Sequence, residues 1–232
     1  MSLKEILADI KGLADPDRAK ILSQFFKTGK GEYGEGDAFL GVGVPELRKI
    51  SRRYSSLPLS ALKAMLTSKT HEIRFTALLV LVMQYESSWE NGKKERFDFY
   101  INHINYINNW DLVDLTADRI AGDYLSNKDR TLLFNMACSE NLWERRISII
   151  ATFNFIKRGD YRDTLKLAEI LLADGHDLIH KAVGWMLREI GNRDRSVEEK
   201  FLDKHHKRMP RTMLRYAIEK FDDEQRRAYM KR

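Results

Sequence analysis

The sequence predicts an all-α fold, an α-solenoid of HEAT-like helix pairs that curves around a concave basic face. Apolar side chains recur at helical spacing along most of the chain, and no strand pattern appears from residue 58 onward. Comparable positions of successive helices also recur at a nearly constant interval. A repeat of about 40 residues with two helices per unit is typical of HEAT solenoids. We expect a single domain over residues 1–232.

The repeat is marked by a basic residue near the start of an apolar helix, at Arg74, Arg146, Lys181 and Arg215. Successive members lie 72, 35 and 34 residues apart, and halving the first interval places a fifth member on Trp110. Stacked repeats put equivalent positions in one column, so we expect these side chains to line the same surface. Four cations and an indole along a groove are typical of a surface that follows a nucleic-acid backbone.

The N-terminal part is expected to hold one or two helices over residues 3–27, with a break at Asp15 because proline follows it. A glycine-rich connection over residues 28–44 contains the pattern G-x-G-x-x-G, at Gly29, Gly31 and Gly34. We interpret it as an ordered loop, because a dinucleotide site needs a preceding strand and the acids that follow would repel a pyrophosphate. Pro45 then suits the first position of the next helix.

The helix that begins near Asn109 carries the first candidate site. Asn109 can cap it, and Asp111 in its first turn suits the positive end of the helix dipole. Trp110 and Asp114 lie one turn apart, beside a core stripe formed by Val113, Ala117, Ile120, Ala121 and Tyr124. An acid next to a surface-reaching tryptophan is a candidate catalytic pair. The alternative is that the acids only compensate the helix dipole.

The helix over residues 178–190 carries the second candidate site. Its core stripe is formed by Ile179, Ala182, Val183, Met186, Leu187 and Ile190. Lys181, Trp185 and Arg188 lie together on another face. A tryptophan off the core stripe between two cations suits binding of an anionic polymer. The alternative is a tryptophan packed at a helix–helix seam with a solvated cationic rim.

Composition excludes several classes of protein. No run of about 18 apolar residues exists, so no membrane span is expected. The single cysteine, Cys138, fits a reducing cytoplasm. No cofactor or metal is expected, because neither the histidine spacings nor any Walker A or G-x-S-x-G pattern supplies a site. The net charge of +6 resides in residues 200–232, which suits a polyanion, although a solvated tail is the alternative.

Four segments resemble the bacterial HEAT-like alkylpurine DNA glycosylases, the AlkD-type DNA alkylation repair proteins. They are Phe39–Arg48, Trp110–Asp114, Asn141–Arg146 and His180–Glu189. The resemblance covers the chain from about residue 20 onward. It implies that Asp114 is the catalytic aspartate, that Trp110 and Trp185 contact the lesion, and that Arg146 and Arg188 bind phosphates. Two positions depart from the family's type member. Asn154 stands where that protein has a lysine, and Phe25 matches a tyrosine of its first repeat, for which the nearby Tyr33 could substitute.

The implied reaction is hydrolysis of the N-glycosidic bond of cationic N3- or N7-alkylated purines in duplex DNA. Asp114 would stabilise an oxocarbenium-like sugar and orient water. The indoles would attract the cationic base, and arginine and lysine would hold the flanking phosphates. The expected partner is alkylated double-stranded DNA, bound by a monomer in the bacterial cytosol at the nucleoid, without metal or cofactor.

Two other functions stay open at this point. A non-catalytic DNA-binding repeat protein of the same family would bind DNA with strong salt dependence and release no base. A protein–protein scaffold, the commonest use of HEAT repeats, would have an apolar binding face and no affinity for DNA. The column of basic residues argues against the scaffold.

Overall fold

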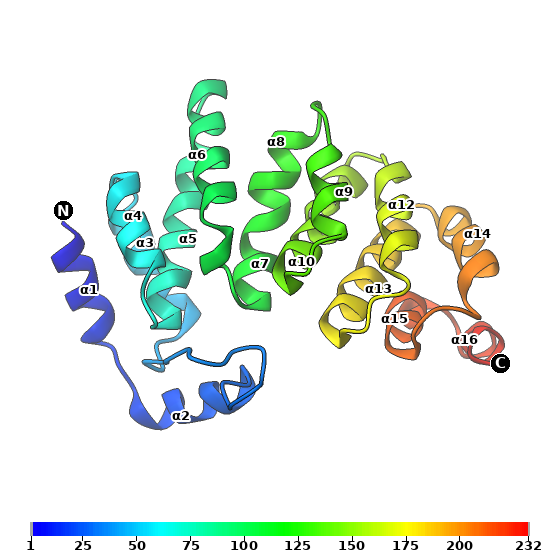
Figure 1. Ribbon diagram of the computed structural model, residues 1–232, viewed down its shortest axis with the longest axis horizontal. Helices are drawn as coiled ribbons and strands as arrows, with labels where there is room; N and C mark the ends of the chain where they lie inside the picture. Colours follow the sequence, from blue (N-terminus) through cyan, green and yellow to red (C-terminus); the bar gives the residue numbers. More distant parts are fainter. Residues whose placement is uncertain (1, 232) are drawn as a thin grey trace. The chain divides into compact units, whose positions relative to one another are not determined.

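The computed structural model describes residues 2–231, and its regular structure is helical apart from one isolated parallel bridge between Ala38 and Thr70. The predicted all-α class is confirmed, with helices that follow one another in antiparallel pairs (Figure 1). These residues form two compact units that divide between Thr116 and Ala117. Within the described part of the chain, no helix combines the length and the apolar character needed to cross a membrane.

The N-terminal unit, residues 2–116, is built around a buried helix. Its helices are α1 (Leu3–Lys11), α2 (Pro16–Phe25), α3 (Val44–Arg53), α4 (Leu59–Leu66), α5 (His71–Glu86), α6 (Glu90–Asn102), η1 (Ile104–Tyr106) and α7 (Trp110–Thr116). Helix α5 packs against α3, α4, α6 and α7 and is buried along most of its length. The predicted break at Asp15 is confirmed, since its side chain accepts the Arg18 N–H and Pro16 begins α2.

The glycine-rich segment between α2 and α3 is a loop, as predicted. The backbone N–H groups of Gly29 and Gly31 donate to the carboxylates of Glu32 and Glu35, so acids of the loop occupy donors that a phosphate would need. Gly41 has a φ of +83°, and a Cβ there would collide with the carbonyl of Asp15. The glutamates of the loop and its close approach to Asp15 therefore shape this segment.

The loop is also tied to α5. The Glu72 carboxylate accepts the N–H groups of Leu40 and Gly41, at 3.0 and 2.7 Å. The Ala38 N–H donates to the Lys69 carbonyl, and the His71 N–H donates to the Ala38 carbonyl. These bonds hold the loop against the start of α5, where it contributes to the first candidate site.

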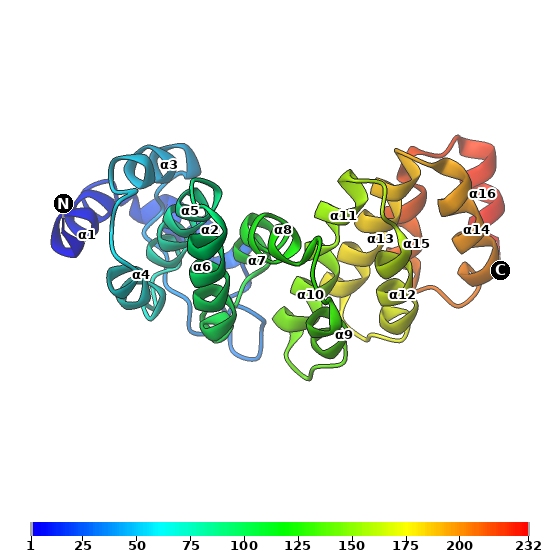
Figure 2. The ribbon, with the colours of Figure 1, turned by 90° about the horizontal axis from the view of Figure 1, so that it is seen from above.

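The C-terminal unit, residues 117–231, continues the paired arrangement (Figure 2). Its helices are η2 (Ala117–Gly122), α8 (Asp123–Leu125), α9 (Thr131–Ala137), α10 (Leu142–Ala151), α11 (Phe153–Lys157), α12 (Arg162–Leu171), α13 (Asp177–Gly191), α14 (Arg195–His205), α15 (Arg211–Ala217), η3 (Ile218–Lys220) and α16 (Asp223–Met230). Helix α13 packs against α10, α12, α14 and α15. Its predicted core stripe is confirmed, because all six of those side chains are fully buried.

The predicted repeat also has a structural counterpart. Each of the five marked positions lies within the first five residues of a helix: Arg74 in α5, Trp110 in α7, Arg146 in α10, Lys181 in α13 and Arg215 in α15. Helices α5, α10 and α13 each contain several buried residues, and each packs against the helix before it. The spacing in the sequence therefore reports a repeated helix position, although burial differs from one member to the next.

Candidate functional site

Trp110 is the first residue of α7, and its ring packs against two phenylalanine rings. The Asn109 side-chain oxygen accepts the Trp110 N–H at 2.9 Å, which agrees with the predicted helix start. The indole stacks on Phe26, with ring centroids 5.4 Å apart and planes 19° apart. The edge of Phe25 meets it at 6.1 Å, and Phe25 itself is 61% exposed. The indole stays partly exposed, so a flat ligand can reach a tryptophan that is already held in place.

Asp114 lies one helical turn after Trp110 and is also partly exposed. The intervening Leu112 and Val113 are fully buried, and Ala117 and Ile120 continue the buried stripe as predicted. The i, i+4 spacing places the carboxylate and the indole on one face of α7. The N-terminal unit thus presents an acid next to an aromatic surface.

A network of buried polar side chains connects α5 to the start of α7, next to Trp110. The Nε2 atom of His71 is 2.8 Å from Oδ2 of Asp111, and its Nδ1 atom is 3.5 Å from Oδ2 of Asp37. Asn108 donates to the other Asp37 oxygen at 3.1 Å. The His71 ring lies among aromatic rings, 4.8 Å from Phe39 and 5.0 Å from Phe26. We call Phe26, Phe39, His71 and Trp110 the aromatic stack.

The charges of this network shift two pKa values in opposite directions. Burial alone would lower the pKa of His71, but its hydrogen bond to Asp111 and the nearby Asp37 outweigh burial and raise that pKa above its usual value. Burial alone would raise the pKa of Asp37, but His71, Arg74 and Asn108 together lower it. Both shifts favour an imidazolium next to an ionised Asp37 carboxylate. The sequence patterns did not single out His71, although His71, Glu72 and Arg74 are polar residues at the start of a largely apolar helix.

The structure corrects the expected placement of Arg74. We expected its guanidinium on an open basic face, but Arg74 is 3% exposed. Its Nη2 atom lies 2.7 Å from Oδ2 of Asp37, and its Nη1 atom donates to the Ser68 carbonyl at 2.8 Å. A phosphate cannot approach a guanidinium enclosed in this way. Arg74 instead stabilises the interior of the N-terminal unit through Asp37 and Ser68.

The second candidate site is in the C-terminal unit, around the partly exposed Trp185 on α13. Its indole lies 6.0 Å from the Phe153 ring, and its Nε1–H donates to Glu189 at 3.2 Å. Two cations lie against Phe153, with Lys157 Nζ at 4.7 Å and the Arg193 guanidinium carbon at 5.6 Å from the ring centroid. Aromatic rings next to cations suit a base and its phosphate. The sequence patterns did not indicate Phe153, because it reaches Trp185 from a different helix.

The cations predicted around Trp185 are already engaged within the protein. Lys181 lies 2.7 Å from Asp177, one turn away on α13. Arg188 forms an ion pair with the half-exposed Glu219. Contact of either cation with DNA therefore requires exchange of a carboxylate partner for a phosphate.

Arg146 is a second corrected placement. We expected it on the same open face, but it is 5% exposed and its Nη1 atom donates to the Leu178 carbonyl at 2.5 Å. Leu178 belongs to α13, so this arginine joins α10 to the helix that carries Trp185. Arg146 therefore stabilises the packing of α10 against α13, the helix that carries the second site.

Asn154, one of the two departures from the family pattern, is buried as well. Its side-chain amide donates to the carbonyl of Asp118, in the π-helical turn η2, at 3.2 Å. The Asp118 carboxylate pairs with Lys157 at 2.7 Å. A π-turn leaves backbone carbonyls without their usual helical donors, and Asn154 supplies one.

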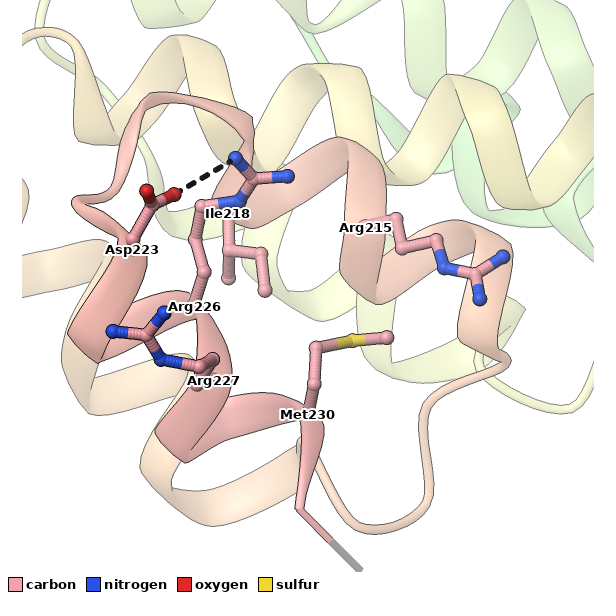
Figure 3. Close-up of a pocket in the computed structure, with 6 residues that line it drawn as sticks. All are labelled: Arg215, Ile218, Asp223, Arg226, Arg227 and Met230. Carbon is pink, nitrogen blue, oxygen red and sulfur yellow. Dashed lines mark ion pairs between the residues drawn. The ribbon is translucent and has the colours of Figure 1, made fainter.

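Arg215 is exposed and borders a hollow of about 350 Å³ between α15 and α16 (Figure 3). Arg226 and Arg227 line the same hollow, which has Ile218 and Met230 as its apolar walls. The Arg226 Nη1 atom is 3.6 Å from Asp223, while the guanidinium groups of Arg215 and Arg227 point to opposite sides of the hollow. The three arginines therefore form a broad basic surface rather than a pocket for a single anion.

The histidines have structural partners and do not gather into a metal-binding cluster in the described part of the chain. Within residues 2–231, the His, Cys, Asp and Glu side chains form no group of three or more able to hold a metal ion. His176 and His180, the pair at i, i+4, are occupied by the loop before α13: His176 accepts the Leu178 N–H, and His180 lies 2.5 Å from the Asp174 carbonyl. Both histidines thus have structural partners.

Comparison with known proteins gives one family and several similar folds. The family model described as DNA alkylation repair enzyme matches residues 6–221. A predicted DNA alkylation repair enzyme from Enterococcus faecalis superposes with a TM-score of 0.73 at 16% identity, covering 90% of this chain and 97% of that one. AlkD2 from Streptococcus mutans superposes with a TM-score of 0.57 at 16% identity, covering 89% of this chain and 99% of that one. No curated protein sequence matches significantly.

Proposed function

Because the chain belongs to the DNA alkylation repair enzyme family, we propose that it is a DNA glycosylase for cationic N3- and N7-alkylpurines in duplex DNA. The observation that carries the proposal is the pair formed by Trp110 and Asp114, a partly exposed indole on an aromatic support with a carboxylate one turn away. The family match supports alkylated DNA as the substrate, and this pair offers the groups that the proposed reaction needs.

The chemistry follows from the charge of the lesion. Alkylation makes the purine cationic, so an indole face attracts it by about 0.5–2 kcal/mol, depending on desolvation. As the glycosidic bond breaks, positive charge moves onto the sugar, and the Asp114 carboxylate stabilises that charge and orients the attacking water. The released base is neutral, so the attraction to the indole weakens after cleavage.

Binding of the duplex is assigned to cations at the surface. Arg215 is exposed, and Lys181 and Arg188 are partly exposed beside Trp185. Phosphate contacts from such side chains set the position of the duplex without reading its sequence. Arg74 and Arg146 are left out of this set because both are buried.

The test is release of 7-methylguanine or 3-methyladenine from methylated duplex DNA. We expect release by the wild type and a fall of about 100-fold or more in Asp114→Asn, the range for loss of one group that stabilises transition-state charge. Asp98→Asn is the matched control, since Asp98 is an exposed acid that pairs with Lys94 on α6. Equal rates in wild type and Asp114→Asn would remove Asp114 from the reaction.

A DNA-binding protein without glycosylase activity is the second candidate. Asn154 favours it, because the family lysine is replaced here by an amide that is committed to the carbonyl of Asp118. This candidate predicts strongly salt-dependent binding to methylated and unmethylated duplexes alike, with no base release by the wild type. The same assay therefore separates the two functions.

A further inference from the structure

His71 reaches the start of α7 by two routes. Its Nε2 atom lies 2.8 Å from Oδ2 of Asp111, the residue directly after Trp110. Its ring also lies 5.0 Å from the Phe26 ring, and Phe26 in turn stacks on the Trp110 indole at 5.4 Å. The imidazole therefore holds both the backbone segment that carries Trp110 and the ring that supports the indole.

We propose that His71 is a positioning residue for Trp110: as an imidazolium between Asp37 and Asp111, it fixes the first turn of α7 and the aromatic stack beneath the indole. The proposal deepens the proposed function and rests on it, because Trp110 is the side chain assigned to the lesion. His71 itself is buried and does not touch the substrate.

The balance of buried charge supports a protonated His71. Three charged side chains face it: Asp111 from α7, Asp37 from the loop before α3, and Arg74 from its own helix, which also pairs with Asp37. The side chains of His71, Asp37 and Arg74 are at most 4% exposed, and that of Asp111 is 16% exposed. With an imidazolium the two carboxylates are balanced by two cations, whereas a neutral imidazole would leave one uncompensated buried charge.

Loss of the His71 proton would break one of its two contacts. A neutral imidazole has a single N–H, so it can donate to only one of the two carboxylates. The other carboxylate then faces a nitrogen lone pair. Either Asp111 of α7 or Asp37 of the loop then loses its contact with the His71 ring, and the support of Trp110 relaxes. The position of the indole should therefore depend on pH on the alkaline side.

The first experiment observes the full-length protein directly. The His71 ring protons and the Trp110 indole N–H are followed by NMR between about pH 6 and pH 9.5, a range that brackets a histidine with a raised pKa. We expect the Trp110 signal to titrate with the same midpoint as His71. In Asp111→Asn both midpoints should fall by about one pH unit or more, because a neighbouring carboxylate is lost.

The second experiment measures the pH profile of base release. We expect a fall of about 10-fold to 100-fold above the His71 midpoint, the range for a small misplacement of a positioned group. In Asp111→Asn this limb should move to lower pH. A residue with only a structural role would instead lower the rate equally at all pH values. The matched control is His103→Gln in the same unit, where the ring stacks on Phe99 at 4.2 Å, and its limb should stay in place.

A Trp110 signal that does not titrate with His71, or an alkaline limb that stays in place in Asp111→Asn, would overturn the proposal. Should Asp111→Asn fail to fold, Asp37→Asn tests the same expectation, since the Asp37 carboxylate also faces His71. The two proposals fail differently. A wild type that releases no base at any pH contradicts the glycosylase, while the NMR titration still decides whether His71 positions Trp110.

Discussion

Glu198 carries a buried carboxyl group that the surrounding protein compensates only in part. The residue is 2% exposed, and its Oε1 atom has no hydrogen-bond partner within residues 2–231. It packs so closely against Gly191, the last residue of α13, that a Cβ there would collide with the carboxyl group. Burial raises the pKa of Glu198 from 4.5 to about 8, although the positive charges of Arg195 and Arg188 oppose that rise.

The perturbation is Glu198→Gln, which keeps the shape and removes the ionisation. Because the folded pKa lies above the unfolded value, the native state binds the proton more tightly and loses stability as the pH rises from 4.5 to 8. At about 1.36 kcal/mol per pKa unit, ionisation of Glu198 can lower the free energy of unfolding by at most about 5 kcal/mol. We expect the variant to be more stable than the wild type by about 2–4 kcal/mol at pH 8, and by less than about 1 kcal/mol at pH 5.

The assay is urea unfolding at pH 5 and pH 8, followed by helical circular dichroism. The matched control is Glu199→Gln, because Glu199 is the next residue, is 36% exposed and pairs with Arg195. It should show no comparable gain at pH 8. A wild type that keeps the same stability relative to Glu198→Gln at both pH values would refute the reasoning, since ionisation of a buried carboxyl group would then cost nothing.

Three further predictions concern packing and DNA binding. Gly184→Ala places a Cβ against the Met213 carbonyl and Tyr216 of α15, so unfolding in urea should show a loss of about 1–3 kcal/mol, while Gly175→Ala, where the space is open, should show none. Arg74→Met removes the nearer of the two cations that face the buried Asp37 carboxylate and should cost about 3–5 kcal/mol in the same measurement. A loss no greater than that of the exposed Arg162→Met would contradict the buried ion pair. Glu219→Gln releases Arg188, so DNA binding followed by fluorescence anisotropy should strengthen, with a salt slope steeper by up to about 0.9; an unchanged slope would show that Arg188 makes no phosphate contact.

The sequence by itself determined the helices, the loop and the repeat. The stripe from Ile179 to Ile190, the break at Asp15 and the helix start at Asn109 all depend on neighbours within one or two helical turns. Such spacings record which side of a helix is apolar, and side chains three or four residues apart share that side in any helix. The pairing of Trp110 with Asp114 on one face of α7 was predictable for the same reason.

Only the tertiary structure decided which partners the polar side chains contact. Arg74 and Arg215 occupy equivalent positions in the repeat, yet one is buried against Asp37 and the other is exposed at the rim of a hollow. His71 finds Asp111 forty residues along the chain. A local pattern is the same whether a guanidinium faces solvent or a carboxylate, because the free energy of a buried charge depends on partners that other helices bring to it. The support of Trp110 therefore followed from packing, while its place on a helix followed from sequence.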